Sequence, residues 1–464
     1  MREPSAATAR AGAVITLEVS GRTTSGEECR PQGDYFQVWL SGPDGLSVSA
    51  TAVPPLPPAA AASQSRPEPD GVFAVRLMHP GTWAAYGMWM LDGDSKEIVL
   101  FSSKVGLWYG PGVPNDSYGK AKGAWEGQAR RDSLGTAKDT TLVAWQDKQL
   151  LKQPSGELLK LKVEEEQEVA GAGIRTASAG QRLAPCVLEQ FYEASSSGAI
   201  SEKTWNWSPN ACALPAVTDG TNSIAQDARI MLIGDATTLR AFELLKQSVG
   251  DCRAVLVMKS QAEKYPNAEV GVAAGSGQHY KCARGVQLWF HGFANVEERA
   301  ASSGYDKGRR VDQFDFAYLG ATVLDLVILG LGKDFLYYDQ DKWSRMLDEF
   351  LPAIKTNVPA AREFWFMSQN RFCGPCVSNG KGYTKGNKPV YLRELQNQAR
   401  ADGMTEVAMA KAEQHGWRPL NQYAISSAIP VMKQDNGWGL KAGQYMYVVQ
   451  HIAHYLPLTM RGGG

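Results

Sequence analysis

The run LDLVILGLG at residues 324–332 constrains the fold of this chain more than any other segment. It is almost continuously apolar, which is typical of a strand buried on both faces of a sheet. Similar runs occur at residues 228–235, 285–293 and 362–370, and helix-forming segments follow several of them. Strands that alternate with helices predict an α/β domain with a parallel sheet over residues 181–464.

The N-terminal quarter has a different pattern. Segments rich in β-branched and aromatic residues follow one another from residue 12 to 110, and Gly, Pro and Asp separate them. Short strands at this spacing predict an all-β sandwich over residues 1–115. Apolar residues alternate along two of the strands and are expected to point into its core. They are Phe36, Val38, Leu40, Phe73 and Val75.

Residues 116–180 are polar and charged. The stretch at 147–173 combines helix formers with a run of mixed charge. Such a run is typical of a solvated surface, so we expect a charged linker with a helix here rather than a binding tail. The whole chain of 464 residues would then be a multidomain protein.

Charge and hydropathy exclude some classes of partner. Lys plus Arg and Asp plus Glu both number 48, so the formal net charge is zero. This argues against bulk attraction to nucleic acid or to an anionic membrane. Apolar runs long enough for a membrane span are missing, and the N-terminus lacks an apolar signal segment, so we expect a cytoplasmic protein.

Cysteine usage follows from that location. In a cytoplasmic chain the cysteines are expected to be mostly reduced, small buried residues. The pair in FCGPC has redox-motif spacing, but a loop-like sequence follows it, so a loop with two thiols is the favoured interpretation. No second Cys or His pair has zinc-site spacing, and no metal or cofactor is predicted. The cysteines are Cys29, Cys186, Cys212, Cys252, Cys282, Cys373 and Cys376.

The segment IMLIGDATTLRAF, residues 230–242, has the form of a strand, a Gly-Asp turn and a helix. Many serine esterases carry their nucleophile at such a turn. Here the residue after Gly234 and Asp235 is Ala236, which has no nucleophilic atom. The chain therefore has the frame of an esterase turn without its reacting group.

Several segments, in a fixed order, carry a resemblance to a known family. They are TWNWSPNACALP, then IMLIGDATTLRAF, LWFHGF, LDLVILGLGKDF and KQDNGWGLKAGQYMYVVQHI. In this order they resemble the PC-esterase family of the SGNH/GDSL superfamily, of the neurexophilin-and-PC-esterase type, over residues 181–460. The segment GDYFQVWLSGPDG resembles a filamin-type immunoglobulin-like repeat. That pairing of domains implies an SGNH-like α/β domain behind a filamin-like sandwich.

The resemblance also implies which residues once did chemistry. In that family a Ser after Gly-Asp attacks the acyl carbon, and an Asp-x-x-His block supplies the base. In this chain Ala236 stands at the Ser position, Asp435 matches the Asp, and Trp438 replaces the His. An indole cannot accept a proton, so nucleophile and base are both missing. The vestigial positions are Gly234, Asp235, Ala236, Thr237, Arg240, His291, Asp435 and Trp438.

A shifted register leaves an alternative open. The family places an Arg three residues after the Ser, and Arg240 is three residues after Thr237, which would make Thr237 the nucleophile. A base would still be needed, and His451 and His454 lie on the predicted terminal helix. His291 could lie above the site, although a satisfied core or rim histidine is the favoured interpretation.

These observations predict a non-catalytic structural or interaction protein with protein partners in a larger assembly. The domain pairing and the Ala/Gly-rich loops extend this prediction to a ciliary axonemal component. The alternative is an acyl-esterase or O-acetyltransferase that acts on a glycan through Thr237. A third hypothesis is that the old cleft binds a carbohydrate or another small molecule.

Overall fold

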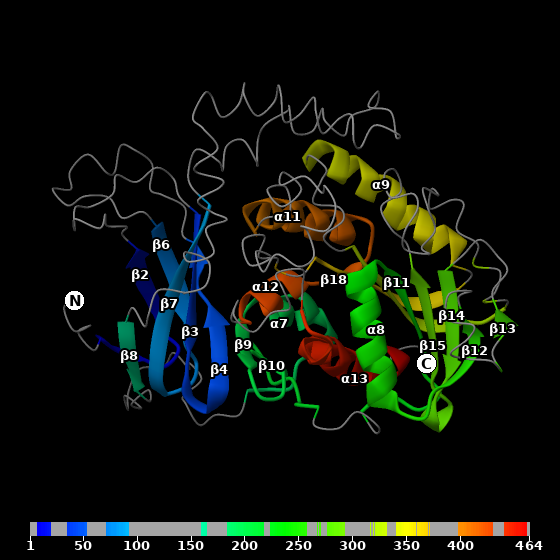
Figure 1. The fold of residues 1–464 in the computed structure, drawn as a ribbon, viewed down its shortest axis with the longest axis horizontal. Coiled ribbons are helices and arrows are strands. Elements are labelled where there is room, and N and C mark those ends of the chain that lie inside the picture. Colours follow the sequence, from blue (N-terminus) through cyan, green and yellow to red (C-terminus); the bar gives the residue numbers. More distant parts are fainter. Residues whose placement is uncertain are drawn as a thin grey trace, which may run out of the picture.

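The computed structural model of the protein places two regions side by side, one made of strands and one of mixed strands and helices (Figure 1). The described residues are 7–19, 35–52, 71–91, 159–164, 183–217, 223–257, 267, 269–270, 276–292, 316, 319, 321–331, 340–358, 360–369, 371, 398–429 and 440–461. Several predictions fall outside them, namely the strand at 96–110, Cys29, the FCGPC pair, Asp435 and Trp438.

The N-terminal region consists of two sheets. The larger has the order β1 (Ala7–Arg10), β8 (Leu159–Glu164), β7 (Gly81–Leu91), β3 (Tyr35–Ser41), β4 (Leu46–Ser49), β9 (Gly198–Ser201) and β10 (Trp207–Pro209). The smaller has the order β2 (Val14–Val19), β6 (Gly71–Arg76) and β5 (Thr51–Ala52). Neighbouring strands are antiparallel except β1 and β8, which are parallel.

Side chains from both sheets pack into one apolar core. Val38 and Leu40 from β3 meet Phe73 and Val75 from β6, and all four are buried as the alternation predicted. The side chain of Phe36 lies outside the described residues. The finer assignment to an immunoglobulin-like filamin repeat stays a prediction.

One element corrects the sequence prediction. Residues 159–164, expected within a charged linker with a helix, form strand β8 between β1 and β7. The physical reason is a period-two pattern, because Leu161 and Val163 are buried in the core while Lys162 and Glu164 are exposed. Lys162 and Glu164, which belong to the charged run that suggested a solvated helix, lie on the outward face of this strand.

The second region is built on an eight-stranded sheet. Its order is β13 (Glu269–Val270), β12 (Arg253–Val257), β14 (Ser276–Lys281), β15 (Gln287–Gly292), β11 (Arg229–Gly234), β16 (Leu324–Gly330), β17 (Ala361–Met367) and β18 (Arg418–Leu420). From β15 to β18 the strands are parallel, and β14 is antiparallel. Every residue of β16 is buried, as its apolar run predicted. An α/β domain is thus confirmed, and its sheet is mixed, with a parallel part from β15 to β18.

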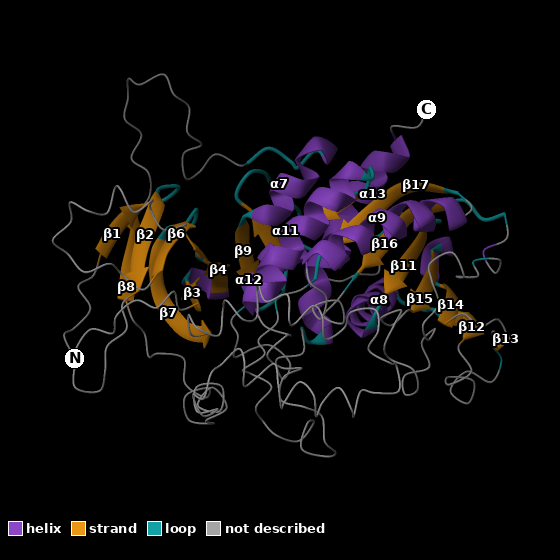
Figure 2. Ribbon diagram, turned by 90° about the horizontal axis from the view of Figure 1, so that it is seen from above, coloured by secondary structure: helices purple, strands orange, loops and turns teal. Residues whose placement is uncertain are grey.

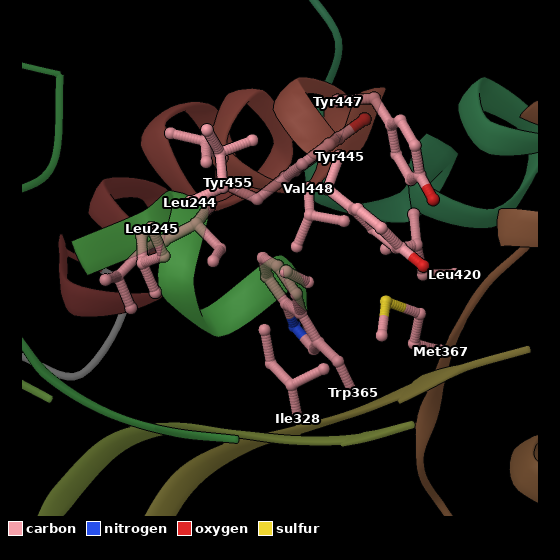
Figure 3. Packing of buried hydrophobic residues seen from close by; sticks show 14 of the residues in the cluster. Leu244, Leu245, Ile328, Trp365, Met367, Leu420, Tyr445, Tyr447, Val448 and Tyr455 are labelled. Atoms are coloured by element: carbon pink, nitrogen blue, oxygen red, sulfur yellow. The ribbon is translucent and has the colours of Figure 1, made fainter. Parts of the chain in front are cut away.

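Helices cover both faces of this sheet (Figure 2). On one face lie α8 (Ala236–Val249) and α13 (Met446–Arg461), and on the other lie α9 (Gln340–Asn357) and α11 (Gln398–Gln414). Figure 3 shows Trp365 and Ile328 of the sheet pointing toward Tyr455 and Val448 of α13. Short elements complete the region, namely α7 (Phe191–Ser196), α12 (Gln422–Ser427), η4 (Leu188–Gln190), η7 (Ala283–Gly285) and η13 (Ala442–Tyr445), while η1 (Pro43–Gly45) belongs to the first region. None of the helices in the described ranges is both long and apolar enough to cross a membrane.

Strand β9 joins the two regions. It pairs with β4 through Leu46 and Ser201 and through Ser47 and Ile200. Successive side chains on a strand point to opposite faces. Ala199 therefore packs into the core of the N-terminal region while Ile200 packs into the core under α13. One short strand thus belongs to both hydrophobic cores, which couples the two regions mechanically.

Four cysteines form disulfides, which corrects the expectation that the thiols are reduced. Cys186 bonds to Cys212 beside the bridge between Pro185 and Ala213. Cys252 precedes β12 and Cys282 follows β14, so their bond closes the end of this antiparallel pair. Backbone pairing brings each couple together across 26 and 30 residues, a relationship that spacing in the sequence does not reveal.

Candidate functional site

The Gly-Asp turn lies at the carboxyl edge of the parallel sheet. In chain order the parallel strands are β11, β15, β16, β17 and β18, and their spatial order is 2-1-3-4-5. The order reverses at β11, and sheets of this type bind ligands outside the carboxyl ends of the strands at that point. Strand β11 ends at Gly234, which is in register with Gly292 of β15 and Gly330 of β16. The turn therefore occupies the position where this fold places a ligand site.

Two of these glycines allow helix α8 to approach the sheet closely. A Cβ atom on Gly234 would overlap the Gly330 carbonyl oxygen and the Thr238 hydroxyl. A Cβ atom on Gly330 would overlap the same hydroxyl. In the structure Thr238 donates its hydroxyl to the Gly330 carbonyl oxygen at 2.9 Å. The first turn of α8 is thus fastened to the ends of both β11 and β16.

Asp235 caps the N-terminus of α8. Its Oδ1 accepts hydrogen bonds from the backbone amides of Thr237 at 2.9 Å and Thr238 at 3.3 Å. The Thr237 hydroxyl donates to the same oxygen. A carboxylate at this place satisfies amides that have no partner within the helix and interacts favourably with the helix dipole. Asp235 therefore has a complete structural role.

The hydroxyls of the first helical turn have acceptors already. Thr237 donates to Asp235, Thr238 donates to Gly330, and residue 236 is alanine. Thr237 is only 5 % exposed. A hydroxyl reacts as a nucleophile when a base takes its proton and a substrate can reach it. The geometry here fits a helix cap better than a reacting group.

His291 faces away from this helix. It pairs with Ile233 across β15 and β11, and paired residues in parallel strands point to the same face of the sheet. Ile233 packs in the core under α9 and α11, whereas α8 packs on the opposite face. His291 is fully buried, with its ring 4.9 Å from that of Phe316. The structure therefore separates His291 from the Gly-Asp turn.

Arg240 connects α8 to the chain that leads into α13. Its Nη1 donates to the Leu440 carbonyl oxygen at 2.7 Å. Leu440 follows residues 430–439, which lie outside the described part of the chain and include Asp435 and Trp438. Arg240 thus ties helix α8 to the chain just before η13.

The histidines of α13 serve its packing. The Nδ1 atom of His451 lies 2.7 Å from the Tyr447 carbonyl oxygen, so Nδ1 carries the proton and donates. Burial lowers the pKa of His451 to about 4, although this hydrogen bond opposes part of the effect. His454 directs Nε2 to the Cys186 carbonyl oxygen at 2.7 Å. Over the described ranges, His, Cys, Asp and Glu form no group of three or more that could hold a metal ion.

Comparison with known proteins gives distant likenesses. No protein-family model and no curated protein matches the chain. A lipase/acylhydrolase from Enterococcus faecalis is similar at 12% identity and a TM-score of 0.30, over 50% of this chain and 96% of that one. A peptidoglycan O-acetylesterase is similar at 13% identity and a TM-score of 0.28, over 53% and 99%. The functional proposal is therefore based on the strand order and the turn geometry.

Proposed function

We propose that the chain is a non-catalytic interaction protein built on a hydrolase-type α/β domain. One observation carries the proposal: the hydroxyls of Thr237 and Thr238 are donors within the frame of the turn, and the position after Asp235 is alanine. A scaffold of this kind keeps its fold while its site residues stabilise it, and function has to be argued from the site. The partners proposed are proteins in a larger assembly.

An axonemal or cytoplasmic location, expected from the sequence, is not part of this proposal. The bonds Cys186–Cys212 and Cys252–Cys282 are the reason. Structural disulfides persist in oxidising compartments and are rare where thiols are kept reduced. We therefore favour an assembly in an oxidising compartment over a ciliary one.

The test is hydrolysis of acetyl esters by the purified chain. We expect no turnover above background from the wild-type protein or from Thr237→Ala. Ala236→Ser restores a hydroxyl but brings no base, so it should also be inactive. Turnover by the wild type that Thr237→Ala abolishes would overturn the proposal.

One contact favours a second candidate, an acyl-esterase or O-acetyltransferase that acts on a glycan. The Thr237 hydroxyl touches a carboxylate, that of Asp235, at a helix N-terminus and at the ligand edge of the sheet. Asp235 would then accept the proton as Thr237 attacks an acyl carbon, and would return it to the departing alkoxide as the acyl-enzyme forms. In that case Asp235→Asn should abolish turnover together with Thr237→Ala.

A further inference from the structure

A cavity of about 710 Å³ lies between the two regions, away from the Gly-Asp turn. Residues of β4, β5 and β6 form one wall. Residues of α7, α11 and α12 form the other. This volume lies within the range of pockets that bind ligands, and such pockets occur preferentially between domains.

The cavity opens where one strand leaves its sheet. β4 belongs to the seven-stranded sheet and β5, which follows directly, belongs to the three-stranded sheet. Between them the Ala50 amide donates to the Val38 carbonyl oxygen, so the chain is still attached to β3 at this point. β6 pairs with β5 only at Phe73 and Ala74 among the residues described. The sheets therefore diverge beside Val75 and Arg76, and the cavity fills this wedge.

The walls are held in fixed positions. β9 pairs with β4 on one side, and Trp207 of β10 is buried in the core under α13. The Trp207 indole donates to the Ala194 carbonyl oxygen of α7 at 2.7 Å. A site built between two coupled regions is preformed, which reduces the ordering cost of binding.

Charges of opposite sign face each other across the cavity. Glu406 and Glu413 come from one face of α11, two turns apart, and Arg76 comes from β6. Within the described part of the chain none of the three takes part in an ion pair. Unpaired charges of both signs on opposite walls are complementary to a ligand that carries both signs itself.

The rest of the lining suits long basic side chains. Phe73, Val75 and Met409 are buried and provide an apolar floor, on which the aliphatic stem of a Lys or Arg can lie. Tyr192 also lines the cavity and is 46% exposed, so its ring is accessible to a cation. The acidic wall, the apolar floor and the aromatic ring thus converge on the same kind of group.

We propose that this cavity binds an extended peptide segment of a partner protein that carries two basic side chains. Glu413 lies seven positions after Glu406 on the helix, a rise of roughly 10 Å. Residues i and i+3 of a polyproline II segment lie on one side and roughly 9 Å apart. Two basic side chains at this spacing meet the two carboxylates, and Arg76 pairs with an acidic group of the same peptide. This inference rests on the proposed function and specifies that the partner protein presents a basic peptide segment.

The experiment uses fluorescence polarisation with the full chain and the peptide Pro-Lys-Pro-Pro-Lys-Pro, labelled at its N-terminus so that its free C-terminal carboxylate is the acidic group for Arg76. We expect saturable binding that high salt weakens, because exposed charge pairs are screened. The double variant Glu406→Gln with Glu413→Gln should bind roughly tenfold more weakly. Glu349→Gln removes the same charge from an exposed position of α9 that does not line the cavity, and it should bind as the wild type does.

Other outcomes would overturn the inference. Equal binding of Pro-Glu-Pro-Pro-Glu-Pro, or equal loss in Glu349→Gln, would mean that the cavity does not select basic peptides. If the protein binds chitohexaose with an affinity that neither Glu406→Gln nor Glu413→Gln changes, the cavity would instead be a site for a neutral glycan. Absence of ester turnover together with absence of peptide binding would refute this inference alone, whereas turnover that depends on Thr237 would refute the proposed function alone.

Discussion

Thr237 donates both its backbone amide and its hydroxyl to a single oxygen of Asp235, two residues earlier in the chain. Gly234, Asp235 and Thr237 thus form a helix cap at the edge where open α/β sheets bind ligands. A turn that looks like part of an esterase site is here part of the frame that joins strand β11 to helix α8.

The first prediction concerns this cap. Asp235→Ala should lower the free energy of unfolding by roughly 1–2 kcal/mol, because three donors lose their acceptor. Asp235→Asn keeps an acceptor oxygen and should cost less. Urea unfolding measures both, and Glu349→Ala, an exposed helical position, serves as the control within about 0.5 kcal/mol of wild type. Equal stability of Asp235→Ala and wild type would contradict the capping role.

The second prediction separates the two glycines. Gly330→Ala and Gly234→Ala should each destabilise the fold by roughly 1–3 kcal/mol through overlap. Thr238→Ala removes the hydroxyl that both new methyl groups would meet. It should rescue Gly330→Ala in part, because the other close atom is the flexible end of Met367. It should not rescue Gly234→Ala, whose methyl group still meets the Gly330 carbonyl.

A double-mutant cycle for each glycine with Thr238→Ala, followed by denaturant unfolding, measures that difference directly. Only in the cycle with Gly330 should the double variant be less destabilised than the sum of the two single variants. The same coupling energy in both cycles would contradict the close contacts described between α8 and the ends of β11 and β16.

A third prediction concerns the disulfides. Peptide mapping without reduction should recover the pairs Cys186–Cys212 and Cys252–Cys282. Closing loops of 26 and 30 residues stabilises a fold by roughly 3–4 kcal/mol each in the chain-entropy description. Reduction should therefore lower the melting temperature by many degrees. Free thiols at these four positions in the folded, air-oxidised protein would contradict the pairing.

The fourth prediction concerns pH. The folded-state pKa of His451, about 4, lies below the ordinary value of 6.5 because the ring is buried. The unfolded state then binds more protons between these two values. The stability that neutral His451 provides is complete above about pH 6.5 and falls as the pH drops through 4, by roughly 2–3 kcal/mol at pH 4.5.

Unfolding free energies at pH 7 and pH 4.5 test this sign. His451→Asn should flatten the dependence while keeping a donor near the Tyr447 carbonyl. His79 and His279 also have pKa values lowered by burial and contribute to the wild-type slope, so the comparison is between wild type and variant. An identical slope in both proteins would exclude His451 as the source.

Much of the fold could be predicted because burial leaves a periodic trace. The largely apolar run of β16, all seven residues of which are buried, and the alternation at Val38 and Leu40 both correspond to observed strands. Strand β8 could not be predicted in this way, because Lys160, Lys162 and Glu164 gave a charge pattern that outweighed its alternation. Pairing of β9 with β4 depends on tertiary contact alone and has no local signal.

The candidate site was predictable in part. The Gly-Asp turn was located correctly, because a strand, two small or capping residues and a helix leave a local pattern. That His291 lies on the opposite face from α8 could not be inferred, since the face of a residue depends on strand register. The cavity beside Glu406, Glu413 and Arg76 joins segments more than 300 residues apart, and no local pattern in the sequence predicts such a juxtaposition.

The central claim is that the turn holds no activated nucleophile, and an activity-based probe tests it most directly. A fluorophosphonate reacts with an activated hydroxyl, loses fluoride and adds its mass to the protein. Intact-mass spectrometry of the wild-type chain after incubation should show no adduct above that of Thr237→Ala, since the Thr237 hydroxyl is buried and bonded to Asp235. A stoichiometric adduct mapped to Thr237 would contradict the account.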